Sequence, residues 1–152
     1  MLSYSKGPNA SLLDRTIGEQ LQMTAQRWPH RLALLSRFQR RKFTWSELLD
    51  VSDRIAHGLD RLGLQPGDRV GIWAMNCWEW LVVHMACARA GVVLVNVNPA
   101  SCVHELAFIL EKSHMRALFL RESYERAQYA DILAWGIRGN VKSVPDEPEQ
   151  PK

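Results

Sequence analysis

The sequence predicts an α/β fold in which helices flank a mainly parallel β-sheet. Residues 69–75 and 92–97 are two almost continuously apolar runs, which is typical of strands that are covered on both faces. Between them lie residues 76–90, a segment of helix length, and parallel strands need a connection of about a dozen residues or more. A third apolar run, residues 116–120, follows another segment of helix length. This alternation of strands and helices is the pattern of a layered α/β domain.

The segment between the first two runs carries signals for both ends of a helix. Asn76 is followed three residues later by Glu79, which matches the asparagine form of a capping box. Gly91 stands where the end of a helix favours a positive φ. We therefore predict a right-handed βαβ unit at the centre of the chain.

A first helix is predicted before this unit. Thr16 and Glu19 have the spacing of a capping box, and Pro29 prevents the helix from continuing much further. Its apolar stripe is expected to consist of Ile17, Leu21, Thr24, Ala25 and Trp28.

A β-hairpin is predicted next, with strands at residues 32–36 and 42–43. Its basic tip, residues 37–41, with the adjoining Lys42, has two interpretations. The four basic side chains of this segment form either a phosphate-binding patch or, as we prefer, a turn exposed to solvent. These side chains are Arg37, Arg40, Arg41 and Lys42.

A second helix is predicted from Thr44, because Thr44 and Glu47 repeat the capping-box spacing, and it should end at Gly63. Its inward residues are expected to be Leu48, Val51, Ile55, Leu59 and Leu62. Residues 65–68 (QPGD) then place proline and glycine at the central positions of a type II turn that leads into the first buried strand.

Two more helices are predicted after the central unit. Ser101 is expected to cap a helix over residues 102–113, and Ser123 to cap a last helix that reaches Trp135 and ends at Gly136. The inward residues of the first of these are expected to be Val103, Leu106, Ala107 and Leu110.

The chain therefore divides into three predicted parts. Residues 1–15 form an extended lead-in, and residues 16–144 form one α/β subdomain. Residues 145–152 are rich in proline and acidic side chains and contain no apolar residue, so we expect this tail to be disordered.

Composition excludes some classes of partner. The chain has 152 residues and a net charge of +3, which is too small an excess to indicate a nucleic-acid groove or an anionic membrane partner. Three cysteines (Cys77, Cys87 and Cys102) lie in apolar segments and suggest buried thiols in a reducing compartment. Because we find neither a signal peptide nor an apolar run long enough to span a membrane, we expect a cytoplasmic protein.

No catalytic motif is visible in these residues. The sequence contains no G-x-G-x-x-G or G-x-x-x-x-G-K-[ST] phosphate loop and no G-x-S-x-G nucleophile elbow. A ligand is expected in the crevice beyond the carboxyl ends of the strands, near residues 75–76 and 98–99, on the general rule for open α/β sheets.

Two further groups of residues have side chains that suit ligand binding. His84 and Cys87 share a helix face, but Cys102 and His104 are two residues apart on a helix and point in nearly opposite directions, which disfavours zinc. The second group consists of Trp73, Trp78 and Trp80. These tryptophans either line an aromatic ligand pocket or, as we prefer, pack inside the fold.

Several separate segments together resemble the opening third of the adenylate-forming enzymes, a superfamily of acyl-CoA synthetases, luciferases and peptide-synthetase adenylation domains. In order they are residues 16–21 (TIGEQL), 43–48 (FTWSEL), 62–70 (LGLQPGDRV), 73–80 (WAMNCWEW), 90–91 (AG) and 97–100 (VNPA). The lead-in, with residues 4–8 (YSKGP) and Leu12-Leu13, resembles the fatty-acyl-CoA synthetase branch.

This resemblance implies ATP-dependent activation of a fatty or other carboxylic acid to an acyl-adenylate, followed by transfer to coenzyme A. ATP, magnesium and coenzyme A are the implied cofactors of the full-length family. The phosphate loop and the later motifs that hold them are not in these residues, so no site residue is carried over and no cofactor is expected to bind this chain alone.

We therefore expect the N-terminal fragment of an acyl-CoA synthetase, inactive by itself and prone to self-association through exposed apolar edges. The alternative is a stand-alone interaction or small-ligand binding module built on the same half-fold.

Overall fold

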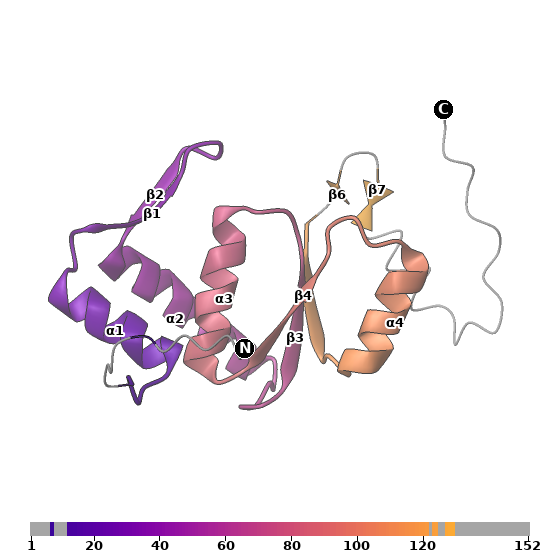
Figure 1. Ribbon diagram of the computed structural model, residues 1–152, viewed down its shortest axis with the longest axis horizontal. Helices are drawn as coiled ribbons and strands as arrows, with labels where there is room; N and C mark the ends of the chain where they lie inside the picture. Colours follow the sequence, from indigo (N-terminus) through magenta and orange to yellow (C-terminus); the bar gives the residue numbers. More distant parts are fainter. Residues whose placement is uncertain (1–6, 8–11, 122, 125–126, 130–152) are drawn as a thin grey trace, which may run out of the picture.

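A computed structural model describes residue 7 and residues 12–121, 123–124 and 127–129 (Figure 1). Most of the predicted lead-in, most of the predicted last helix and the whole predicted tail at 145–152 lie outside the described residues. Within the described part, no helix is both long enough and apolar enough to cross a bilayer.

The centre of the fold is a parallel sheet of three strands, as predicted. Strands β3 (Arg69–Trp73), β4 (Val93–Val97) and β5 (Ala117–Leu120) are arranged in the order β4-β3-β5. Helix α3 (Trp78–Ala90) connects β3 to β4, and α4 (Val103–Ser113) connects β4 to β5. Figure 1 shows α3 and α4 on opposite sides of this sheet. The parallel crossover on which the fold prediction depended is therefore confirmed.

Alternate residues of β3 contribute to two separate cores. Val70 and Ile72 pack with Leu59 of α2 and with Val83 of α3. On the other face, Trp73 packs in a second cluster with side chains of β4 and α4, namely Val97 and Leu106. Because a strand directs successive side chains to opposite faces, one buried strand anchors a helical layer on each side.

Strand β4 departs from the expectation that it is covered on both faces. Val93 is 48% exposed, and Asn96 is also exposed. The reason is its position, because among the described strands β4 has only β3 as a neighbour and lies at the edge of the sheet.

Helices α1 (Ile17–Arg27) and α2 (Trp45–Arg61) pack on α3. Both predicted capping boxes are present, Thr16 with Glu19 and Thr44 with Glu47. A third core cluster joins the three helices through Leu21, Leu48 and Val82.

Three predicted inward residues are exposed instead. Ile17 is the first residue of α1, while Trp28 and Leu62 are the C-cap residues of α1 and α2. Each stands at an end of its helix, beyond the stretch that the neighbouring helices cover.

The predicted hairpin is confirmed as β1 (Leu32–Ser36) paired antiparallel with β2 (Arg41–Thr44). The turn at residues 65–68 is confirmed as well, with Gly67 at φ 89° and the Asp68 N–H donating to the Gln65 carbonyl at 2.9 Å. Gly91 ends α3 in the left-handed conformation, at φ 70°, as predicted.

The predicted start of α3 is wrong. Its N-cap is Cys77 rather than Asn76, and the Cys77 side chain provides no capping hydrogen bond. Instead, the Trp78 N–H donates to Oε1 of Gln39 at 2.8 Å. A side chain from the hairpin tip therefore satisfies one of the free N–H groups at the start of the helix.

The predicted start of α4 is one residue early. Cys102 is the N-cap, and its N–H donates to the Glu105 carboxylate at 3.0 Å. Ser101 is buried, and its own N–H donates to the Asn98 carbonyl at 3.0 Å, which keeps Ser101 in the preceding turn.

The prediction that a helix begins after Ser123 is wrong. Residues Ser123–Tyr124 form β6 and pair antiparallel with Ala127–Gln128, which form β7. The reversal brings Tyr129 back onto Trp73, and their rings stack with centroids 3.9 Å apart. Burial of the Tyr129 ring against the sheet is a tertiary interaction, and a prediction from local helix signals does not include it.

Candidate functional site

The carboxyl edge of the parallel sheet is the expected ligand position, and two stacked aromatic rings fill part of it. Trp73, the last residue of β3, is fully buried under Tyr129, with an interplanar angle of 13°. The Trp73 indole N–H donates to the Asn98 carbonyl at 2.9 Å. The Tyr129 hydroxyl donates to the Pro99 carbonyl at 2.8 Å. These bonds hold the loop after β4 against the end of β3.

The side chain of Asn98 is also engaged in this loop. Its Oδ1 atom accepts a hydrogen bond from the Ala100 N–H at 3.0 Å. Asn98 therefore shapes the turn between β4 and α4 through both its carbonyl and its side chain.

A shallow hollow of about 500 Å³ lies beside this loop and along α4. Its polar lining residues are Asn98, Ser101, His104 and Glu105, and its apolar ones are Phe108 and Ile109. The Phe108 side chain is 65% exposed, which is a large apolar surface to leave in contact with water. Such a hollow suits a contact with an apolar group better than ionic chemistry, because none of its charged residues is buried.

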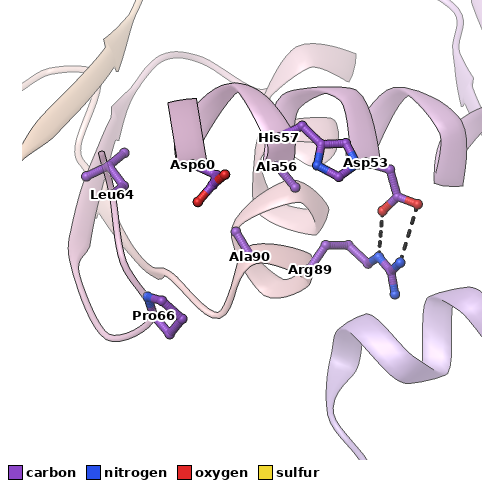
Figure 2. Close-up of a pocket in the computed structure, with 8 residues that line it drawn as sticks. All are labelled: Asp53, Ala56, His57, Asp60, Leu64, Pro66, Arg89 and Ala90. Carbon is purple, nitrogen blue, oxygen red and sulfur yellow. Dashed lines mark hydrogen bonds and ion pairs between the residues drawn. The ribbon is translucent and has the colours of Figure 1, made fainter. Parts of the chain in front are cut away.

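A second hollow of about 270 Å³ lies at the opposite end of the sheet, where Leu64 and Pro66 precede β3. Figure 2 shows Asp53, His57 and Asp60 of α2 along one wall, with Arg89 of α3 facing Asp53.

Arg89 serves as a structural connection in this second hollow. Its Nε and Nη2 atoms donate to the two carboxylate oxygens of Asp53, at 2.6 and 3.3 Å (Figure 2). Its Nη1 atom donates to the Gly18 carbonyl at 3.2 Å and to Gln22 at 2.9 Å. One guanidinium thus joins α1, α2 and α3, and each of its three nitrogen atoms donates within the fold.

The cysteines differ in exposure. Cys87 is buried in the core between α3 and the sheet, and this burial raises the pKa of its thiol to about 11. Burial also raises the pKa of Cys77, which is half-buried. Cys102 is exposed, so the expectation that all three thiols are buried is wrong for this residue, because it caps α4 at the surface.

The candidate zinc ligands lie apart in the fold. His84 stacks on Trp80 with ring centroids 5.4 Å apart, Cys87 lies in the core, and His104 lines the hollow along α4. Among the residues that the structure describes, no group of three or more metal-ligating side chains occurs.

The three tryptophans that were candidates for an aromatic ligand pocket are packing residues. Trp78 packs against the cluster of Leu21, Leu48 and Val82, and Trp80 packs against the core on the α3 side of the sheet. The partners that sequence reasoning missed are Gln39 and Tyr129, and no local pattern around either residue marks its long-range contact.

Known proteins resemble this chain in sequence. The sequence model of the family described as "AMP-binding enzyme" matches residues 21–150. The protein named "Medium-chain acyl-CoA ligase ACSF2, mitochondrial" of Rattus norvegicus is 38% identical over 133 residues, covering 87% of this chain and 22% of that protein. The Homo sapiens protein of the same name is also 38% identical, with the same coverage. The chain thus spans about a fifth of the length of these relatives.

Solved structures share the fold. The N-terminal domain of FACL13 from Mycobacterium tuberculosis aligns with a TM-score of 0.69 at 24% identity, covering 90% of this chain and 38% of that one. The luciferase-like enzyme of the mealworm Zophobas morio aligns with a TM-score of 0.72 at 20% identity, covering 82% and 29%. Mycobacterium smegmatis MbtA aligns with a TM-score of 0.64 at 33% identity, covering 70% and 20%.

Proposed function

The chain belongs to the AMP-binding enzyme family, and on that premise we propose that it is the N-terminal part of an ATP-dependent acyl-CoA synthetase. The observation that carries the proposal is the 38% identity to a medium-chain acyl-CoA ligase across 87% of the chain. In such an enzyme, a carboxylate oxygen attacks the α-phosphorus of ATP and displaces pyrophosphate. The thiol of coenzyme A then attacks the acyl carbon and displaces AMP.

The part assigned to these residues is a scaffold. The parallel sheet, with α3 and α4 on its two sides, supplies a rigid wall, and Trp73 fixes the loop that leaves β4. The residues contain no phosphate loop, and the comparisons cover only about a fifth of the relatives' length. We therefore propose that this chain alone neither forms an acyl-adenylate nor retains magnesium-bound ATP.

A direct assay tests this inactivity. The 152-residue chain is incubated with ATP, magnesium, a medium-chain fatty acid and radiolabelled pyrophosphate. No exchange of label into ATP is expected. Measurable exchange, or saturable magnesium-dependent binding of ATP, would contradict the proposal.

A chimera tests the assignment to the acyl-CoA synthetases. The matched N-terminal region of the rat ligase is replaced by this chain, and thioester formation is measured with medium-chain acids. The native ligase is the positive control, and the ligase without the region is the negative one. We expect activity above the negative control, since an equivalent scaffold should restore the sheet.

Self-association is a further part of the proposal. Among the described strands, β4 has one free edge, on which Val93 is exposed, and Phe108 of α4 exposes further apolar surface. Sedimentation velocity over a range of concentrations should detect oligomers.

The hollow along α4 supports a second candidate, a stand-alone module that binds a small ligand or a protein partner. A monodisperse monomer with one cooperative unfolding transition would favour this candidate over the fragment.

We also propose a cytoplasmic location for this chain. Its support is the chain's free cysteines, Cys77, Cys87 and Cys102. Fractionation of cells that express a tagged copy tests it, and recovery in an organelle would contradict it.

A further inference from the structure

The tip of the β1–β2 hairpin combines exposed apolar and basic side chains. Phe38 is 96% exposed, and Arg37 and Arg40 on either side of it are also exposed. In the described part of the chain, neither of these two guanidinium groups forms an ion pair. In Figure 1 the hairpin rises above α1 and α2, and its loop lies near the start of α3. Nothing in the described fold therefore covers this combination of groups.

The tip is also held in one orientation. Gln39 points back into the fold, where its Oε1 atom accepts from the Trp78 N–H at 2.8 Å and its Nε2 atom donates to Glu79 at 2.7 Å. The Ser36 hydroxyl contacts the same Oε1 atom at 3.0 Å. Because Gln39 is anchored, its neighbours Arg37, Phe38 and Arg40 are presented outward with little loss of conformational entropy on binding.

The strand beside the tip extends this surface. Leu35 pairs with Lys42 across the hairpin, and both side chains are exposed. Directly paired residues project from the same face of a two-stranded ribbon, so one apolar and one basic side chain continue the pattern.

Three acidic side chains lie near the hairpin, and two of them accept hydrogen bonds. Glu79 accepts from Gln39, and Glu47 accepts from the Thr44 N–H in the capping box. Asp50 lines a surface hollow together with Arg41, Lys42 and Arg54. Residues 36–46 carry four basic side chains and no acidic one, so positive charge predominates around Phe38, although the net charge of the whole chain is only +3.

We propose that this hairpin tip docks on the surface of an anionic lipid bilayer. The Phe38 ring enters the boundary between headgroups and acyl chains, while Arg37, Arg40 and Lys42 bind lipid phosphates. One ring and a few cations give weak, reversible attachment that salt reduces. A nucleic-acid site is less suited to this surface, since the described tip offers a single protruding aromatic ring and no groove that follows a phosphate backbone.

The test uses the full chain and measures its co-sedimentation with lipid vesicles at low ionic strength. One vesicle population is phosphatidylcholine alone, and the other contains about a third phosphatidylserine. We expect binding to the anionic vesicles only, with a decrease on addition of salt. Phe38→Ser should weaken this binding roughly tenfold or more, because it removes the inserting ring. Arg37→Gln with Arg40→Asn should do the same by removing two cations, at roughly fivefold each.

Arg40 has φ 52°, and asparagine tolerates this left-handed conformation better than most residues, so Arg40→Asn preserves the turn. The matched controls are Arg61→Gln and Leu62→Ser, which change another exposed basic and apolar pair at the far end of α2. These controls should bind vesicles as the unmodified chain does. Circular dichroism verifies that each variant is folded.

Three outcomes would overturn the proposal. The first is no preference of the unmodified chain for anionic vesicles. The second is an equal loss of binding in Phe38→Ser and Leu62→Ser. The third is tip-dependent binding to a soluble polyanion such as heparin without binding to vesicles, which would assign the surface to a nucleic-acid or acidic protein partner.

Discussion

The side chain of Gln39 caps helix α3 by accepting a hydrogen bond of 2.8 Å from the backbone N–H of Trp78. The same amide donates to the Glu79 carboxylate at 2.7 Å. A hairpin tip distant in sequence thereby supplies the acceptor that the local N-cap residue, Cys77, does not supply. The start of the central helix and the position of the hairpin consequently depend on each other.

Replacing Gln39 by alanine should destabilise the fold by about 1 kcal/mol, the usual cost of losing a helix N-cap. The Trp78 amide should also exchange with solvent faster, because its acceptor is gone. Urea unfolding and amide hydrogen exchange measure the two effects. Gln26→Ala is the matched control, at an exposed position of α1, and it should change stability by less than about 0.5 kcal/mol. Equal effects of the two substitutions would contradict the capping role.

Alanine at two helical glycines should have opposite effects. A Cβ atom at Gly18 would lie 2.8 Å from the backbone carbonyl oxygen of Ala88, so α1 and α3 would have to separate. We expect Gly18→Ala to destabilise the protein by about 1–3 kcal/mol. A Cβ atom at Gly58 meets nothing within 4 Å, and Gly58→Ala should stabilise α2 by about 0.5–1 kcal/mol. Denaturant midpoints that move in the same direction for both variants would refute this explanation.

The Glu47 carboxylate should make stability depend on pH. Hydrogen bonds from the Thr44 backbone N–H and then from its hydroxyl hold the pKa of Glu47 below its usual value. A carboxyl group whose pKa is lower in the folded state stabilises the fold above its unfolded pKa, about 4.3, and loses this effect as the pH falls through the folded value.

The difference in Tm between the unmodified chain and Glu47→Gln should therefore be largest near neutral pH and shrink below about pH 4. Glu19→Gln provides an independent repeat, because hydrogen bonds from Thr16 lower the pKa of Glu19 in the same way. A difference that grows on acidification would show that the carboxylate form is not the one that the fold prefers.

The three cysteines should react with iodoacetamide in the order of their exposure. Cys102 is exposed and should be alkylated first, and the half-buried Cys77 should follow more slowly. Cys87 is buried with a pKa raised to about 11, so it should react only after unfolding. Peptide mass spectrometry over time gives the order, and Cys102→Ser should remove the fast phase alone. Early modification of Cys87 would mean that α3 does not stay packed on the sheet.

Local sequence signals located most elements because their physical causes are local. The capping pairs Thr16 with Glu19 and Thr44 with Glu47 lie within single turns, and Gly91 was identified from the conformation that it permits. The candidate site was less predictable. The crevice near Asn98 was placed by a general rule for parallel sheets, but the ring that fills part of it belongs to Tyr129. The distance along the chain between Trp73 and Tyr129 leaves no periodic signal that could pair them.

By itself, the sequence determined the order of strands and helices as far as β5, the parallel sheet and the family, because continuous apolar runs, caps and ordered motifs occur along the chain. Only the tertiary structure decided which ends of these elements are covered. The N-cap position of α3 is Cys77 rather than Asn76, and the acceptor for the Trp78 N–H comes from Gln39 of the hairpin. Val93 is exposed because β4 lies at the sheet edge. The free energy of such contacts depends on residues far apart in sequence. Where a tertiary contact is more favourable than the local conformational preference, the tertiary contact decides the structure.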